Sequence, residues 1–503
     1  MTKHTRPPNR PDEATREDAA AAHPDDHEAH LRLGLARLSA GRTEEARQPL
    51  QRAATLAPRD PRPHTALAAL AMKQGRHEDA IAAYRSLAAG DTGYGDMLNN
   101  LGVALDGLGR RDEGVAALRT AALLLPNSAS VQDNLGNVLL SMSLAREAEL
   151  CHRRALALGS SNNGTTWSNL GNALHRLGRL EESEAAYRRA IALSPNVARY
   201  HTNLALTLLL AGKFREGWEE YEWRWRDHPN FPPYLRDRPW RGEAMPSGTL
   251  LLQAEQGYGD TVQFIRYARL ARQRVGRIVL ACQPELVRLM RTVPWLDEVV
   301  PETAAVPAFD GGLTLMSLAG MFRTSAEPDT IPGGVPYLSV PAGAGIRLPE
   351  AKGFKVGIAW AGRPTHGDDW NRSIPARLLA PLLAVPGVSF FSLQRGAVAE
   401  RLGRPPTGSI AEVADLCADF ADTAQVVAAM DLVISVDTAV VHVAGAMDKP
   451  AWVLLPPVPD FRWRMGGDTT PWYPSLRLFR RSFEAGWEPV IAEITRQLAI
   501  ISN

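Results

Sequence analysis

The sequence predicts two architectures in one chain: an all-α superhelix of paired helices, followed by an α/β region with parallel sheets. Two observations lead to this prediction. A leucine followed by a small residue recurs about every 34 positions within residues 28–226. After residue 248, short apolar runs alternate with amphipathic segments, which is typical of a parallel sheet with helices on its faces. The length of 503 residues agrees, because single hydrophobic cores rarely grow that large.

The composition is that of a globular protein without a strong global charge. Hydrophobic residues make up 45%, and 56 basic side chains stand against 55 acidic ones. The net charge of +1 provides no general attraction to nucleic acid or to an anionic membrane surface, so we expect no nucleic-acid partner. Cys151, Cys282 and Cys417 form no Cys-x-x-Cys motif, which argues against a zinc site and a disulfide framework.

The first 27 residues carry charges throughout and lack the apolar core of a signal peptide. We expect residues 1–27 to be a disordered leader. No run of about 18 uninterrupted apolar residues occurs in the sequence, so we expect no transmembrane segment. These features together predict a cytoplasmic protein.

The repeat is defined by two small residues in each unit. The first follows the leucine, and the second comes twelve positions later. The leucines are Leu33, Leu67, Leu101, Leu135, Leu170 and Leu204. Small residues let two helices approach closely, while the leucines fill the seam between them. This register predicts six helix pairs over residues 28–226 and resembles the tetratricopeptide repeat (TPR) family.

Stacked helix pairs of this kind form a concave surface that usually binds extended peptides or protein segments. The resemblance therefore implies a protein or peptide partner in the groove. Asparagines recur on the first helix of the units, close to the leucine: Asn99, Asn100, Asn134, Asn169 and Asn203. A row of amides could hold a peptide backbone, and it could equally fill the groove between helices. A third alternative is an array that only supports its neighbour.

Aromatic residues and prolines concentrate between the last repeat and residue 248, in FREGWEEYEWRW and PNFPPYLRDRPWRGE. We expect residues 227–247 to be a linker. Aromatic side chains spaced like Trp218, Tyr221, Trp223 and Trp225 are typical of a terminal helix that packs on the next domain. A ligand or membrane surface is the alternative.

The α/β region divides into two series, residues 248–340 and 341–503. The predicted strands are 249–255, 277–283, 355–360, 388–394, 431–437 and 451–456. A final helix near 487–500 could return toward the first series. Two Rossmann-like halves are implied, and their ligand is expected between them at the carboxyl ends of the strands.

The first candidate site follows the strand 249–255, where a loop with Gly257 and Gly259 leads to Asp260 at the start of a helix. Glycines permit a tight turn and the close approach of a ligand. The loop is not a GxGxxG motif, which disfavours a dinucleotide site. Asp260 is a candidate catalytic carboxylate, and a role as helix N-cap is the alternative.

The second candidate site follows the strand 431–437. Asp437 and Thr438 end the strand, and His442 comes one helical turn later. A hydroxyl and free backbone N–H groups at a helix N-terminus suit an anionic group, because the orphan donors and the helix dipole point toward it. The alternative is that Asp437 caps the helix and His442 lies in the core.

The third candidate site is the loop WAGRPTHGDDWNRS, which offers Arg363, His366, Arg372 and Ser373. Such a basic, polar loop could neutralise a diphosphate without a metal. The sequence contains no Asp-x-Asp motif, which disfavours a metal-held nucleotide sugar.

Together these segments resemble the heptosyltransferase-like family of inverting glycosyltransferases, which pair two Rossmann-like domains in the GT-B arrangement. The matching residues are Gly259-Asp260 and Asp437-Thr438-Ala439-Val440-Val441-His442. The resemblance covers residues 248–500 and implies that Asp260 is the general base for an acceptor hydroxyl. It also implies a donor site, which would consist of Asp437, Thr438, Ala439, His442, Arg363, Arg372 and Ser373. The family usually has a lysine after the first strand of the second half, and none occurs here.

The first hypothesis is therefore an inverting, metal-independent glycosyltransferase that uses a nucleotide-diphosphate sugar as co-substrate, needs no cofactor and selects its acceptor through the repeats. The second hypothesis is a non-catalytic adaptor. In that case the α/β region has kept its fold and lost donor binding, since a fold alone does not establish a function.

Overall fold

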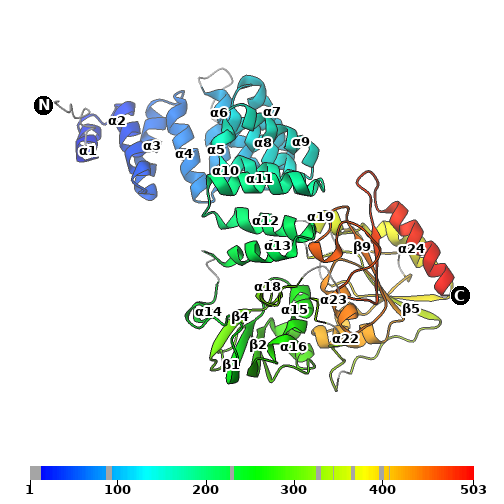
Figure 1. Cartoon of the computed structure of the whole chain (residues 1–503). Coiled ribbons are helices and arrows are strands. Elements are labelled where there is room, and N and C mark those ends of the chain that lie inside the picture. Colours follow the sequence, from blue (N-terminus) through cyan, green and yellow to red (C-terminus); the bar gives the residue numbers. More distant parts are fainter. Residues whose placement is uncertain are drawn as a thin grey trace. The chain divides into compact units, whose positions relative to one another are not determined.

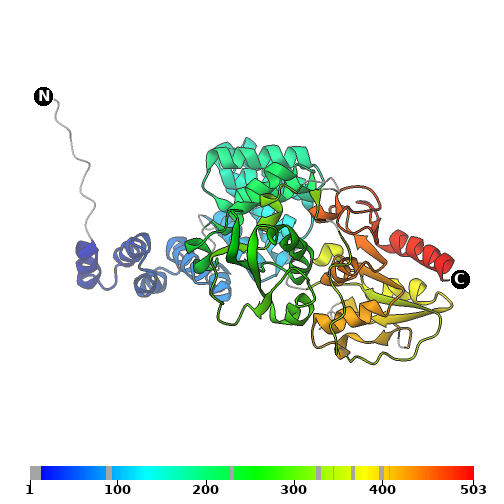
Figure 2. The same cartoon turned by 60° about the horizontal axis from the view of Figure 1, so that its bottom comes forward.

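The computed structural model describes residues 13–85, 93–226, 231–324, 330–332, 334–343, 345–363, 369–395, 402–406 and 408–502. The chain divides into two compact units, one of residues 1–177 with 185–195 and one of residues 178–184 with 196–503. In the described parts, the first unit is helical and the second adds two parallel sheets, as Figures 1 and 2 show. No helix of the described residues is long and apolar enough to cross a membrane.

The repeat region is built from consecutive helix pairs (Figure 1). The pairs are α2 (His27–Ser39) with α3 (Thr43–Leu56), α4 (Pro61–Lys73) with α5 (His77–Arg85), α6 (Tyr94–Gly107) with α7 (Arg111–Leu124), α8 (Ala129–Ser141) with α9 (Ala145–Ala157), α10 (Gly164–Arg176) with α11 (Leu180–Leu193), and α12 (Ala198–Leu210) with α13 (Phe214–Tyr221). The predicted all-α repeat array is confirmed. The last pair, α12 and α13, belongs to the second compact unit.

A residue with a left-handed backbone ends the first helix of each pair. These residues are Gly41, Gly75, Gly109, Ser143, Gly178 and Gly212. A left-handed residue after a helix lets its last carbonyls find backbone partners, and glycine adopts that conformation without a steric cost. The turn residue therefore recurs with the same period as the leucines.

The small residues of the repeat lie where the two helices of a pair meet. A Cβ on Gly102 would lie 2.5 Å from Leu118 Cγ, and one on Gly136 would lie 2.6 Å from His152 Cε1. Real side chains do not approach so closely, so a larger residue would push the helices apart. The prediction that small residues allow close helix packing is confirmed.

The N-terminal segment is more ordered than expected. Residues 13–22 form α1 (Glu13–Ala22), in which Ala20 is buried. The expectation of a disordered leader over residues 1–27 is therefore wrong for this helix. Residues 1–12 lie outside the described part.

The second unit contains two parallel sheets. The first has the order β3-β2-β1-β4 and the second the order β10-β9-β8-β5-β6-β7. The strands of the first sheet are β1 (Met245–Gln253), β2 (Val275–Cys282), β3 (Glu298–Pro301) and β4 (Gly311–Thr314). Those of the second are β5 (Phe354–Ala359), β6 (Val388–Ser392), β7 (Ala411–Glu412), β8 (Leu432–Val436), β9 (Ala451–Leu455) and β10 (Leu476–Arg480). The predicted fold class is confirmed.

Helices follow the strands of both sheets. Beside the first sheet these are α15 (Tyr258–Phe264), α16 (Ala268–Ala271), α17 (Val287–Met290) and α18 (Ser317–Met321), and beside the second α19 (Asp369–Arg372), α20 (Ala380–Leu383), α22 (Phe420–Ala428), α23 (Ala439–Ala446) and α24 (Glu488–Ile501). The last helix, α24, buries Ile494 and Leu498 in one cluster with Leu379 and Leu382. The expectation that it returns toward the first half is therefore wrong, because its apolar face covers the second sheet.

The aromatic segment after α12 packs the last helix pair onto the sheets. The Trp218 ring meets the rings of Phe264 and Phe461 edge to face, with centroids 5.9 and 5.5 Å apart. Trp218 and Tyr221 lie in the same buried cluster as the first sheet. The predicted packing role is confirmed for Trp218 and Tyr221.

The expected linker is largely folded. Residues 231–247 contain α14 (Pro233–Asp237), the buried Trp240 and the start of β1. The backbone N–H of Trp240 donates to the carbonyl of Gly312 at 2.9 Å. This segment is thus an edge of the first sheet and not a free connection.

Candidate active site

Asp260 lies on the first turn of α15, directly after β1. Its Oδ2 accepts a hydrogen bond from the Gly257 N–H at 2.8 Å, so the carboxylate holds the turn that carries it. This hydrogen bond back to the N-cap residue occupies Oδ2, and Oδ1 faces the second half. The side chain is 22% exposed.

Arg462 contacts that second oxygen from the other half of the unit. It lies on the short helix Phe461–Trp463 after β9, and its Nη2 pairs with Asp260 Oδ1. Its Nε donates to Gln263 Oε1 at 2.5 Å, and its Nη1 donates to Asp460 Oδ1 at 2.7 Å. Burial would lower the pKa of Arg462, but the charges of Asp460 and Asp260 outweigh it and raise this pKa.

His442 and Asp437 form a pair at the carboxyl end of β8. Asp437 Oδ1 lies 3.8 Å from His442 Nε2, and His442 Nδ1 lies 3.1 Å from the Tyr473 hydroxyl. Burial alone would raise the pKa of Asp437, but the hydrogen bond and charge of His442, with the charge of Arg372, hold it at about 2. His442 is buried between protein groups, as the core alternative predicted.

Gly259 brings the first half against this pair. A Cβ at Gly259 would lie 2.6 Å from His442 Cδ2, so only glycine lets α15 pack this closely on α23. The loop glycine therefore serves the contact between the two halves.

Thr438 precedes α23 in extended conformation, with φ −138° and ψ 169°. Its hydroxyl lies 3.0 Å from Ser435 Oγ and does not cap the helix. Ala439 is the first residue of α23, so its N–H belongs to the group of donors at a helix start that lack intrahelical partners. This leaves the start of α23 without a side-chain cap from Thr438.

The basic loop after β5 reaches the carboxyl end of β8, where Asp437 lies. Arg372 Nη1 donates to the Asp437 carbonyl at 3.0 Å. Ser373 donates to Asp369 Oδ1 at 2.9 Å and accepts from the Gly362 N–H at 3.1 Å. Ser373 therefore shapes the loop that presents Arg372.

Arg363 is exposed and lies over the ring of Tyr258, 5.5 Å from its centroid. Tyr258 begins α15, so Arg363 of the second half reaches the helix that carries Asp260. His366, the remaining candidate of this loop, lies outside the described residues.

The structure thus brings the predicted residues of both halves to one place. Arg372 contacts Asp437, Asp437 pairs with His442, and Arg462 interacts with both Asp437 and Asp260. From the sequence, residues 460–474 are expected to pack between the sheet and the final helix, with closure over the donor as the alternative, so Arg462, Asp460 and Tyr473 are given no role of their own. The only signal for them was their place after β9, at the same end of the sheet as Asp437.

The asparagines of the repeats bond within the array. Asn134 Nδ2 donates to Asn99 Oδ1 at 3.0 Å, and Asn99 Nδ2 donates to Asn100 Oδ1 at 3.3 Å. Asn169 Nδ2 donates to Asp133 at 3.4 Å. These bonds fit the alternative of polar groove filling, and peptide binding by Asn100, Asn134 and Asn169 stays a prediction. Asn203 lies in α12 of the second unit.

Comparison with protein families finds matches in the repeat region and in the second sheet region. Residues 161–212 match the TPR repeat, and residues 13–61 and 65–129 match the tetratricopeptide repeat. Residues 387–485 match glycosyltransferase family 9 (heptosyltransferase). This last match includes Asp437, Thr438, His442 and Arg462, whereas Asp260 lies outside it.

Among curated proteins, Protein FlbA of Caulobacter vibrioides is 28% identical over 440 residues, covering 80% of this chain and 72% of FlbA. Type IV pilus assembly protein PilF of Pseudomonas aeruginosa is 32% identical over 133 residues, covering 26% of this chain and 53% of PilF. The chain thus spans about half the length of PilF. Among solved structures, the APC/C hetero-tetramer Cut9–Hcn1 has a TM-score of 0.39 and 23% identity, covering 43% of each chain.

Proposed function

Since the chain joins tetratricopeptide repeats to a C-terminal glycosyltransferase family 9 domain, we propose that it transfers a sugar from a nucleotide-diphosphate sugar to an acceptor selected by its repeats. One observation carries the proposal. The carboxylate of Asp260, from the first sheet, meets a cluster of charged groups around Asp437 and Arg462 at the carboxyl ends of β8 and β9. Ligands of open α/β sheets bind at this edge.

In this reaction Asp260 is the general base. Its carboxylate takes the proton of an acceptor hydroxyl as the hydroxyl oxygen attacks the anomeric carbon. The bond between that carbon and the diphosphate oxygen breaks, and its electron pair stays on the nucleoside diphosphate. Attack from the face opposite the leaving group inverts the anomeric centre. Asp260 must first release Arg462, whose Nη2 holds the oxygen not used by Gly257.

The leaving diphosphate is negatively charged and needs positive partners. The start of α23, where Thr438 provides no side-chain cap, offers the backbone N–H of Ala439 and the helix dipole. Arg372 and Arg363 lie on the neighbouring loop and supply charge-assisted hydrogen bonds. In the proposal these groups take the place of a metal ion and of the family's lysine. The pair of Asp437 and His442 holds the carboxyl end of β8 in place.

The acceptor or its carrier binds the repeats in this proposal. Repeat arrays usually bind extended protein segments, and the last helix pair packs directly on the first sheet through Trp218. An acceptor segment held by the repeats is therefore tethered to the same chain that carries the base, which raises its local concentration.

The donor site is tested by titration calorimetry of nucleoside diphosphates and nucleotide sugars with the full chain. We expect one nucleotide series to bind, and Arg372→Met to weaken it about ten-fold or more, since hydrogen bonds to charged groups contribute roughly 1.5–3 kcal/mol. Arg377→Met is the matched control, because Arg377 is exposed on the following short helix Ala376–Leu379. If no nucleotide or nucleotide sugar binds the wild type, the non-catalytic adaptor is the better interpretation.

A further inference from the structure

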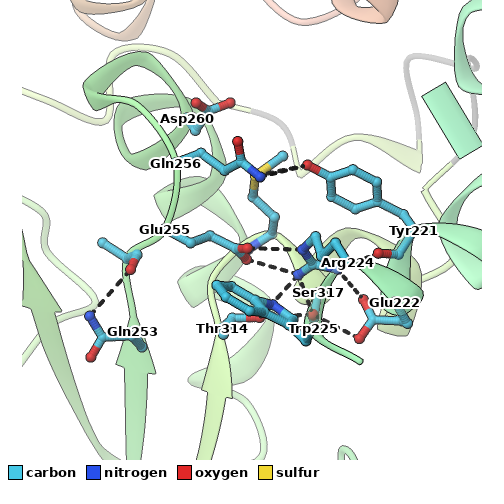
Figure 3. Close-up of polar contacts among 12 residues, drawn as sticks. Tyr221, Glu222, Arg224, Trp225, Gln253, Glu255, Gln256, Asp260, Thr314 and Ser317 are labelled. Carbon is cyan, nitrogen blue, oxygen red and sulfur yellow. Dashed lines mark hydrogen bonds and ion pairs between the residues drawn. The ribbon is translucent and has the colours of Figure 1, made fainter. Parts of the chain in front are cut away.

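We propose that Arg224 and Tyr221, at the end of the last helix pair, are positioning residues that hold the turn carrying Asp260. The proposal rests on the proposed role of Asp260 as the base. Figure 3 shows the contacts: Arg224 and Tyr221 approach from one side, and Glu255 and Gln256 lie at the end of β1, one turn before Asp260.

Arg224 holds Glu255 through two hydrogen bonds from one edge of its guanidinium group. Its Nε donates to Glu255 Oε2 and its Nη2 to Glu255 Oε1, each at 2.9 Å. The Met316 N–H also donates to Glu255 Oε1 at 3.0 Å. The side chains of Arg224 and Glu255 are 5% and 1% exposed. A bidentate ion pair that is this deeply buried fixes the position and the orientation of the Glu255 carboxylate. Glu255 therefore has little freedom to move.

The remaining donors of Arg224 are also used. Its Nη2 contacts Thr314 Oγ1 at 3.1 Å and Ser317 Oγ at 2.8 Å, and its Nη1 donates to Glu222 Oε1 at 2.9 Å. Thr314 ends β4, the neighbour of β1 in the sheet. Arg224 therefore ties the ends of two adjacent strands to the short helix Glu222–Trp225 that follows α13.

Gln256, the next residue of the turn, has a left-handed backbone with φ 64°. This conformation costs a non-glycine residue roughly 1 kcal/mol or more and persists only when the surroundings hold it. The Gln256 side chain donates to the Tyr221 hydroxyl at 3.3 Å, and the Gln256 backbone carbonyl accepts from Gln283 Nε2 at 3.4 Å. Tyr221 thus helps to hold the residue of this turn whose backbone is strained.

The position of the turn also determines the position of Asp260. Glu255 is held by Arg224, Gln256 is held by Tyr221, and Gly257 donates its N–H to Asp260 Oδ2. A general base must lie within hydrogen-bond reach of the proton that it removes, and small displacements are costly to the rate. The last helix pair of the repeat array therefore helps to fix the position of the Asp260 carboxylate. It does so through the turn, since neither Arg224 nor Tyr221 contacts Asp260.

Two variants test this. Tyr221→Phe keeps the ring in the core and removes only the hydroxyl, so the chain is expected to fold. Arg224→Lys keeps the charge and cannot form the bidentate grip. Tyr187→Phe is the matched control, because its hydroxyl donates to Asn172 at 2.6 Å, and both residues belong to the first unit, whereas the turn belongs to the second.

The first readout is hydrogen exchange of the full chain, followed in peptides that cover residues 254–264. We expect exchange there to rise about five-fold in Tyr221→Phe, as for the loss of one hydrogen bond, and more in Arg224→Lys. In both variants, peptides of β5, β8 and β9 keep wild-type exchange, and Tyr187→Phe keeps wild-type exchange at residues 254–264, since the hydrogen bond that it loses, to Asn172, belongs to the repeats. Wild-type exchange at 254–264 in both variants overturns the proposal, and so does a uniform rise across the second unit, which reports global destabilisation.

The second readout is sugar transfer with a donor identified by titration. We expect kcat to fall about five-fold in Tyr221→Phe while the KM for the donor stays within about two-fold, because only the base is misplaced. A rise in KM at unchanged kcat contradicts a positioning role. If the wild type transfers no sugar, the proposed function fails, and hydrogen exchange alone then decides whether Tyr221 and Arg224 hold the turn.

Discussion

Arg462 and Asp260 form an ion pair that joins the two sheets of the second unit, although they lie 202 positions apart in the sequence. Arg462 is 8% exposed and also holds Asp460 and Gln263. The structure therefore has the proposed base paired with a cation from the other half. In the proposed reaction, the acceptor hydroxyl replaces Arg462 as the partner of Asp260.

Replacing Arg462 by lysine tests how much this contact stabilises the unit. A single ammonium group cannot reach Asp260, Asp460 and Gln263 at once, so partly buried carboxylate oxygens lose partners. We expect the free energy of unfolding to fall by about 2 kcal/mol in urea denaturation. The control is Arg496→Lys, whose pair with Glu493 lies on an exposed helix face and contributes little. Equal losses in the free energy of unfolding for the two substitutions would contradict a stabilising role of the Arg462 contacts.

Gly259→Ala tests the close packing of α15 on α23. The added methyl group would overlap the His442 ring, since a Cβ there lies 2.6 Å from Cδ2. Overpacking a buried contact costs roughly 1–3 kcal/mol, so we expect a lower Tm. Gly466→Ala is the matched control, because a Cβ at Gly466 meets no atom within 4 Å. The packing argument fails if Gly259→Ala melts at the temperature of the wild type.

The Asp437–His442 pair predicts a loss of stability in acid. The pKa of Asp437 in the folded chain is about 2, below its ordinary value of 3.8. A depressed carboxyl pKa stabilises the fold above the ordinary value, and this contribution is lost as the pH falls from about 4 toward 2. By pH 3 the loss amounts to about 1 kcal/mol.

Urea unfolding at pH 6 and pH 3 checks this for the wild type and Asp437→Asn. We expect the stability difference between the two proteins to shrink by about 1 kcal/mol at pH 3. Asp415→Asn, on the exposed surface of the short helix Ala414–Leu416, should keep a constant difference. A difference for Asp437→Asn that does not depend on pH would contradict the pairing with His442.

The repeats could be predicted because their signal is local and periodic. Each leucine and small residue acts within one helix pair, and the same contact recurs in every unit. The long apolar strands β1, β2, β5, β6, β8 and β9 could be predicted for the same reason. The strands β3, β4, β7 and β10 were missed, since β3, β4 and β7 are very short and β10, LRLFR, alternates apolar and basic residues.

The site could be predicted only in part. Asp260 and Asp437 each follow an apolar strand, and that place in the sequence indicates the active edge of a sheet. Arg462 also follows an apolar strand, β9, but its role depends on partners far away in the chain, so its place in the sequence did not distinguish it. The Arg224–Glu255 pair was missed for the same reason, since charged residues are ordinarily exposed and only the fold shows that these two are buried.

Asp260→Asn is the most direct test of the proposed function. The amide oxygen can still accept from Gly257, so the turn is expected to remain folded. In a single-turnover assay with the donor that binds best, we expect transfer to slow about 100-fold or more, as for the loss of a general base, while the nucleotide Kd stays within about two-fold. Transfer at the wild-type rate would contradict the assignment of Asp260 as the base.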